Sequence, residues 1–175
     1  METVTLKIWE KSTILGECAL IFVTVGNHNQ GFGRLIKKMD EIAGTINEKV
    51  IMQVGYTTYK PVNAEYFSFV GSFEEILRLN REAQVVVSHA GAGSIITALK
   101  EKTPVIVVPR LKKYNEHMND HQLEIAKAMS KNKNVTVIYD VEALDDCLKV
   151  DFNFVEEFVH DKLAIQLKKY ILSLS

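Results

Sequence analysis

The chain has 175 residues, of which 47% are hydrophobic and 25% are charged, and its 21 basic and 22 acidic residues give a formal net charge of −1. This composition is typical of a soluble globular protein with one domain and a full core. The balanced charge argues against a nucleic-acid-binding protein, and no apolar run approaches the roughly 18 residues that a membrane span needs.

Three segments divide the sequence. Residues 1–18 are charged and do not resemble a signal peptide, so we expect them to form an N-terminal extension. Residues 19–150 are expected to form the folded domain, and residues 151–175 a C-terminal helix that packs on the domain or on a partner. The cysteines, Cys18 and Cys147, lie far apart and form no CxxC motif, which indicates a reducing, cytoplasmic compartment.

Strand-length apolar runs alternate with helical patterns along residues 19–150. The runs are 20–25, 50–54, 66–70, 85–88, 105–109 and 135–139. Helices are expected at 32–43, after the N-cap Ser72, from about Ser94, at 120–130 and around 141–149. Because the runs are continuous and β-branched, both faces of the sheet should be buried. The sequence therefore predicts an α/β fold with a Rossmann-like, doubly wound parallel sheet.

The last segment has an amphipathic pattern. A helix over 151–174 would place Phe154, Phe158, Leu163, Leu167 and Ile171 on one stripe. That stripe either packs on its own domain or docks on another chain.

A small-residue turn, SHAGAGS (88–94), follows the fourth run. Glycines at 91 and 93 permit positive φ and let a ligand approach the backbone. The helix that follows offers unpaired N–H groups, and Ser94 adds a hydroxyl, so the turn is a candidate site for a phosphate or diphosphate. The alternative is a tight turn with no ligand. The spacing is neither GxGxxG nor that of a P-loop.

Two histidines lie close to this turn in the expected fold. His89 precedes it directly and could donate to a phosphate or sugar oxygen, or be an ordinary core residue. Gly26 and the polar loop after it follow the first strand, at the same edge of the sheet. His28 in that loop is a candidate general base, with a plain polar turn as the alternative.

A second polar cluster spans residues 110–122. His117 and His121 have a spacing that could hold a metal on a helix, but no third ligand is evident. The other interpretation is that Asn119 or Asp120 caps the helix, while His121 and Gln122 face a sugar. The basic residues Arg110, Lys112 and Lys113 either form a solvated loop or contact a phosphate.

These motifs resemble those of a known family. SHAGAGSI (88–95), NEHMNDHQLEIA (115–126) and FVTVG (22–26) resemble the glycosyltransferase family 28 C-terminal domain over roughly residues 20–150. The chain is similar in particular to free-standing half-transferases, namely the small subunit of the dolichol-diphosphate GlcNAc transferase and bacterial exopolysaccharide glycosyltransferase subunits.

The resemblance implies the C-terminal, donor-binding half of a GT-B fold. The UDP diphosphate would lie over the turn, and Thr97 stands where relatives place an acidic residue that grips the ribose. The residues expected to bind the donor are Gly26, Ser88, His89, Gly91, Ala92, Gly93, Ser94, Thr97, Arg110, Asp120, His121 and Gln122. His28 and His89 are the candidate catalytic residues, and neither a metal nor another cofactor is expected.

The resemblance also implies the reaction and its setting. An inverting displacement would transfer a sugar from a UDP-sugar to a lipid-linked acceptor, with GlcNAc, galactose and glucuronic acid all open as the sugar. The acceptor half would be a membrane-anchored partner that recruits this chain to the cytoplasmic membrane face, and the isolated chain could form a homodimer. The alternatives are a non-catalytic nucleotide-sugar-binding or stabilising subunit, and a nucleotide-sugar epimerase, which would need two domains in one chain.

Overall fold

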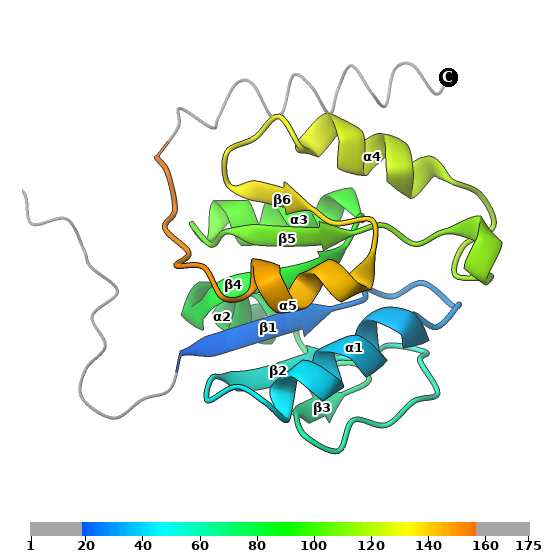
Figure 1. Ribbon diagram of the computed structural model, residues 1–175, viewed down its shortest axis with the longest axis horizontal. Coiled ribbons are helices and arrows are strands. Elements are labelled where there is room, and N and C mark those ends of the chain that lie inside the picture. Colours follow the sequence, from blue (N-terminus) through cyan, green and yellow to red (C-terminus); the bar gives the residue numbers. More distant parts are fainter. Residues whose placement is uncertain (1–18, 157–175) are drawn as a thin grey trace, which may run out of the picture.

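The computed structural model describes residues 19–156. Its centre is a six-stranded parallel sheet in the order β3-β2-β1-β4-β5-β6 (Figure 1). The strands are β1 Leu20–Thr24, β2 Lys49–Gln53, β3 Glu65–Phe67, β4 Ala83–His89, β5 Val105–Val108 and β6 Val135–Val137. The order reverses between β1 and β4, and ligands of such folds bind beyond the carboxyl ends of the strands at this switch point.

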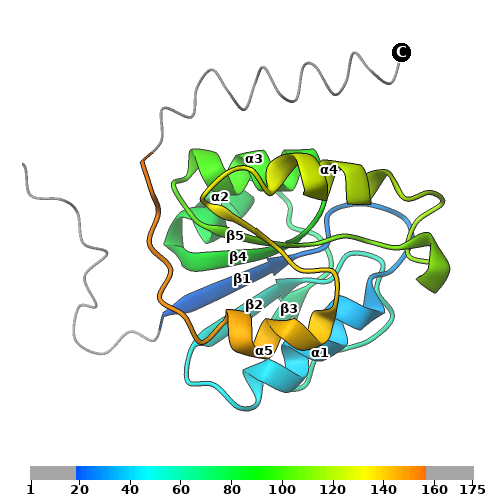
Figure 2. The same cartoon turned by 45° about the horizontal axis from the view of Figure 1, so that its top comes forward.

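Helices cover both faces of the sheet. They are α1 Gly33–Ala43, α2 Phe73–Glu82, α3 Ala92–Lys100, α4 His121–Met129 and α5 Leu144–Cys147, with 3₁₀ turns η1 Lys112–Tyr114 and η2 Val141–Ala143. Figure 2 shows α1 and α5 on one face and α2, α3 and α4 on the other. The predicted Rossmann-like, doubly wound parallel sheet is therefore confirmed.

Each face of the sheet has its own apolar core. In β4, Val85 and Val87 pack with α1 and α5, while Val86 packs with α2, α3 and α4. All four residues of β5 are buried, as the continuous β-branched runs predicted. Ser72 is the N-cap of α2 and accepts a hydrogen bond from the Glu75 amide.

Several predicted boundaries are wrong. The runs at 66–70 and 135–139 form strands of only three residues. The third helix begins at Ala92 rather than Ser94. The region 141–149 forms a 3₁₀ turn and one short helix, and η1 was not predicted.

The helix expected from residue 151 does not begin there. Residues 151–156 have no regular secondary structure, because Asn134 holds them: its Oδ1 accepts from the Val155 amide at 2.7 Å and its Nδ2 donates to the Val155 carbonyl at 2.9 Å. Phe152 and Phe154 pack against the two cores of the domain. The rest of the predicted helix and the predicted extension, residues 1–18, lie outside the described residues.

Candidate functional site

His89 stands at the switch point, at the end of β4. Its side chain is wedged between two glycines: a Cβ on Gly26 would lie 2.6 Å from its Cε1, and a Cβ on Gly91 would lie 2.1 Å from its Nε2. Gly26 has a φ of +67°, whereas Gly91 has a φ of −85°. Gly91 is therefore required by the imidazole ring and not by a left-handed backbone, which corrects the prediction made for it.

The His89 imidazole is neutral. Burial, and to a smaller extent the nearby Arg110 guanidinium, lower the pKa of His89 to about 4. A neutral imidazole has one N–H donor. Its buried Nδ1 makes no hydrogen bond within the described part of the chain. His89 therefore does not supply a positive charge at neutral pH.

The turn beyond His89 is open to a ligand. Gly91 is the N-cap of α3, without a side-chain cap bond, so the first N–H groups of the helix have no intrahelical partner. A Cβ on Gly93 would meet nothing within 4 Å. The Ser94 hydroxyl has no recorded hydrogen bond in residues 19–156, whereas Thr97 Oγ1 donates to the Gly93 carbonyl at 2.8 Å. The positive end of the helix is thus available to an anion.

Ser88 does not face this turn. Its side chain is fully buried in β4, and its hydroxyl donates to the His89 carbonyl at 2.9 Å. The prediction that Ser88 contacts the donor is therefore wrong for this arrangement.

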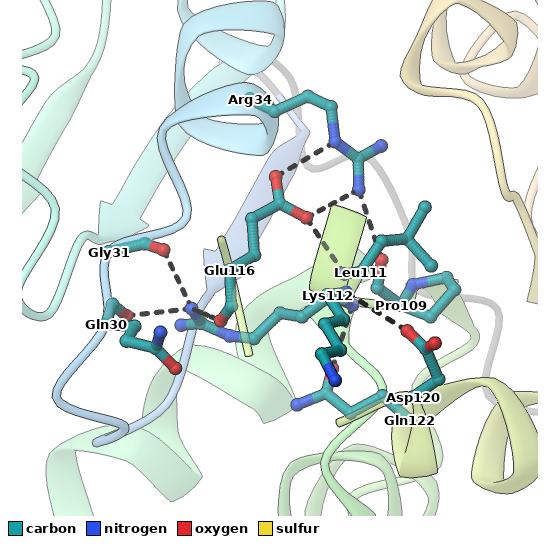
Figure 3. A network of polar contacts seen from close by, with 10 residues as sticks. Gln30, Gly31, Arg34, Pro109, Leu111, Lys112, Glu116, Asp120 and Gln122 are labelled. Atoms are coloured by element: carbon teal, nitrogen blue, oxygen red, sulfur yellow. Dashed lines mark hydrogen bonds and ion pairs between the residues drawn. The ribbon is translucent and has the colours of Figure 1, made fainter. Parts of the chain in front are cut away.

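Arg110 is a second correction, because its side chain is fully buried and its guanidinium is already hydrogen-bonded within the fold. Figure 3 shows the surrounding network of polar contacts, with Gln30, Gly31 and Glu116 labelled. Its Nη1 donates to the carbonyls of Gln30, Gly31 and Glu116, and its Nη2 donates to the carbonyl of Val25 at 2.9 Å. Burial lowers the pKa of Arg110 to about 10, so the guanidinium remains charged at neutral pH. Arg110 fixes the loop after β1 instead of contacting a phosphate.

Glu116 is a site residue that sequence reasoning missed. Its carboxylate accepts from Arg34 Nε and Nη2 at 3.0 and 2.9 Å and from the Leu111 amide at 3.1 Å. The two charged side chains lie 82 positions apart in the chain, so no local pattern could have paired them. The pair joins α1 to the loop after β5.

The start of α4 offers fewer free groups than predicted. Gln122 Oε1 accepts from the Arg110 amide at 3.0 Å, and Asp120 Oδ1 accepts from the Lys112 amide at 3.0 Å. Asp120 is the N-cap of α4 but makes no side-chain cap bond, whereas the side chain of Asn119, one residue earlier, accepts from the His121 amide at 3.2 Å. The exposed His121 ring, 3.5 Å from a Glu124 oxygen, and the Gln122 amide nitrogen are the groups still able to contact a sugar.

His28 is arranged as a donor. Its Nδ1 accepts from the Gln30 amide at 3.2 Å, so the proton of the neutral ring is on Nε2. Burial lowers its pKa, with smaller contributions from His117 and Arg110. The His28 and His117 rings stack with their centroids 4.6 Å apart. His117 therefore lies against His28 and does not pair with His121. Among the described residues, no group of three His, Cys, Asp or Glu side chains could hold a metal ion.

The fold and the site together define the class of protein. A doubly wound parallel sheet with an open helix N-terminus at its switch point is a Rossmann-like architecture. The family model of the glycosyltransferase family 28 C-terminal domain matches residues 20–149, and the chain belongs to this family.

Named relatives agree with this family. The chain is 34% identical over 122 residues to the human UDP-N-acetylglucosamine transferase subunit ALG13, covering 63% of this chain and 10% of the relative. It is 28% identical over 124 residues to the subunit of the same name from Debaryomyces hansenii, covering 69% of this chain and 56% of the relative. The matched stretch therefore spans little of the human protein and about half of the yeast protein.

Solved structures share the fold at low sequence identity. The solution structure of ALG13 matches with a TM-score of 0.51 and 18% identity over 78% of this chain and 86% of that chain. The glycotransferase of kitacinnamycin matches with a TM-score of 0.57 and 21% identity over 99% of this chain and 43% of that one. This likeness to less than half of a glycosyltransferase supports the predicted half of a GT-B fold. In residues 19–156, no helix combines the length and apolar character needed to span a membrane.

Proposed function

We propose that this chain is the nucleotide-sugar-binding subunit of an inverting glycosyltransferase. It binds a UDP-sugar, UDP-GlcNAc or a related one, whose sugar is transferred to a lipid-linked acceptor together with a membrane-anchored partner. The observation that carries the proposal is the open, uncapped N-terminus of α3 at the switch point of a family 28 domain.

The proposed chemistry follows from the geometry of that turn. The diphosphate lies over residues 91–94, where the first N–H groups of α3 and the Ser94 hydroxyl stabilise the charge that develops on the leaving UDP. The neutral His89 adds a dipole beneath the turn. No metal is needed for this stabilisation, because the donors belong to the backbone.

The sugar end of the donor is expected at the start of α4. The Gln122 amide nitrogen and the exposed His121 ring are available to its hydroxyls. Arg110 acts indirectly: its backbone amide donates to the side-chain oxygen Oε1 of Gln122, and its guanidinium holds the loop after β1. It is a positioning residue.

The general base is expected outside this chain. A direct displacement needs a group that takes the proton of the acceptor hydroxyl, and the acceptor nitrogen of His28 is already bonded to Gln30. A base on the partner subunit satisfies this need. The same observation favours the second candidate, a non-catalytic nucleotide-sugar-binding or stabilising subunit, whose partner carries out the chemistry.

Two measurements on the full chain test the proposal. Calorimetry with UDP, UMP, UDP-GlcNAc, UDP-galactose and UDP-glucuronic acid, in EDTA, should show binding of UDP with a preference for one UDP-sugar. The preferred UDP-sugar, labelled in the sugar, is then added with the chain to washed membranes of the native cells. Label in the lipid extract that depends on the chain supports transfer. Binding without transfer favours the non-catalytic subunit, and no binding contradicts both.

A further inference from the structure

A cleft of about 470 Å³ lies beside α1, apart from the turn at 91–94. The early turns of α1, the loop after β2 and the segment after η1 line it, and none of its lining residues belongs to α3 or α4. The loop after β1 lies between the two regions, because Gly26 packs against His89 while Gly31 lines the cleft.

The walls of the cleft are fixed from both sides. Thr57 Oγ1 accepts from the Phe32 amide at 2.9 Å, which ties the loop after β2 to the start of α1. The buried Asp40 carboxylate holds the same loop further along, by accepting from the Tyr59 hydroxyl at 2.7 Å and the Asn63 amide at 2.8 Å. The Arg34–Glu116 pair fixes the opposite wall. A cleft with walls held in this way is preorganised for a ligand.

The cleft has an excess of positive charge. Its one lining carboxylate, Glu116, is engaged by Arg34. Lys37 has no ion-pair partner among the described residues, and its Nζ lies 5.7 Å from the centroid of the Tyr59 ring. Lys112 and Lys113, next to Tyr114 in the chain, likewise have no ion pair within residues 19–156. An anion entering the cleft therefore meets a lysine whose charge no described carboxylate neutralises.

Two tyrosine rings give the cleft flat walls. The side chains of Tyr56 and Tyr114 are 56% and 51% exposed. The Tyr114 ring is held over the Arg34 guanidinium, 4.9 Å from its carbon. The Thr58 hydroxyl and the Asn115 side-chain amide belong to residues that line the same space, and neither makes a hydrogen bond within residues 19–156. Aromatic faces with a few uncommitted polar groups are typical of a site for a small polar ligand.

We propose that this cleft binds a sugar phosphate. The phosphate contacts the ammonium group of Lys37, a sugar ring lies against Tyr114, and the side chains of Thr58 and Asn115 bond to its hydroxyls. The binding of a sugar phosphate does not depend on the proposed glycosyltransferase function.

The test follows backbone amide resonances of the ¹⁵N-labelled full chain during titration with glucose 1-phosphate. The amides of Gly31, Gly33, Thr57 and Asn115 should shift saturably, while glucose and inorganic phosphate bind more weakly. Saturation with UDP should shift the amides of residues 91–94 and leave the bound glucose 1-phosphate in place. GlcNAc carried on a short isoprenyl diphosphate distinguishes the source: tighter binding than glucose 1-phosphate indicates a lipid-linked head, and equal binding a free sugar phosphate.

Charge reversal at the cleft provides the decisive comparison. Lys37→Glu should weaken glucose 1-phosphate by about tenfold, because it turns a charge-assisted contact into a repulsion, and it should leave UDP affinity unchanged. Lys127→Glu, on the exposed face of α4, is the matched control and should change neither. Displacement of glucose 1-phosphate by UDP, or equal affinity in the two variants, would overturn the proposal. A chain that binds glucose 1-phosphate in the cleft but no nucleotide would instead refute the proposed function.

Discussion

The Nε2 atom of His89 lies 2.1 Å from the position that a Cβ on Gly91 would occupy. No real Cβ approaches a ring so closely, so the His89 ring requires a glycine at position 91. The pair fixes the backbone at the start of α3, which is the part of the chain that we propose lies under the diphosphate.

Gly91→Ala should destabilise the protein by about 1–3 kcal/mol, since an added methyl group overpacks a buried site. The double-mutant cycle with His89→Ala tests the cause by urea denaturation. In the His89→Ala background the same glycine change should cost much less, because the ring is gone. Additive effects of the two changes would show that the contact is not the reason for the glycine.

Removing the Arg110 guanidinium should have a larger effect. Arg110→Met leaves the carbonyls of Val25, Gln30 and Gly31 without a buried donor, and we expect a loss of about 3–5 kcal/mol in the free energy of unfolding. Lys113→Met in the exposed η1 turn is the control and should change the stability by less than about 0.5 kcal/mol. An Arg110→Met chain as stable as the control would contradict the assigned role.

Stability should fall as the pH is lowered toward 4. The pKa of His89 is about 4 in the folded chain, against an ordinary value of 6.5. Between these values the unfolded state binds the proton and the folded state does not, so stability rises with pH through this window. The shift corresponds to about 3 kcal/mol, lost progressively from pH 6.5 to 4.

Chemical denaturation at a series of pH values measures this loss. His89→Gln should flatten the profile in that window. His28→Gln should change the pH profile less. The His28 side chain is only half-buried, and burial is the main cause of its lowered pKa. A profile unaffected by His89→Gln would contradict the neutral, buried imidazole.

Asn134→Ala should release the segment that precedes residue 157. Both of its hydrogen bonds to Val155 are lost, and we expect a destabilisation of about 1–3 kcal/mol together with faster hydrogen exchange at the Val155 amide. Asn153→Ala, at an exposed position of the same segment, should alter neither quantity. Equal exchange in the two variants would show that Asn134 does not hold the segment.

The parallel sheet could be predicted because its signal is local. Runs such as VVV (85–87) are apolar at every position, and only strands buried on both faces show this pattern. The helix at 151–174 was predicted from the same kind of local periodicity. It is wrong at its start because Asn134, distant in sequence, holds the backbone at Val155 by a tertiary hydrogen-bond pair.

The candidate site stays a prediction at the turn 91–94 and at the start of α4, which were chosen for residue types that suit a phosphate and a sugar. Arg110 and Ser88 were placed in the site wrongly, because the sequence does not reveal which polar side chains become buried and find partners inside the fold. Glu116 and Asp40, whose carboxylates fix the loops around the proposed cleft, could not be found without the pairing of distant residues.

The central claim is that a nucleoside diphosphate lies over the first turn of α3. It is tested most directly by calorimetric titration of UDP into the wild-type chain, Gly93→Val and Lys100→Ala, each confirmed as folded by its Tm. A side chain at position 93 enters open space, so the fold should be kept while the place of the diphosphate is filled. We predict that Gly93→Val loses UDP binding by at least about 100-fold, while Lys100→Ala, at the other end of the helix, binds like the wild type. Unchanged UDP affinity in a folded Gly93→Val chain would contradict the claim.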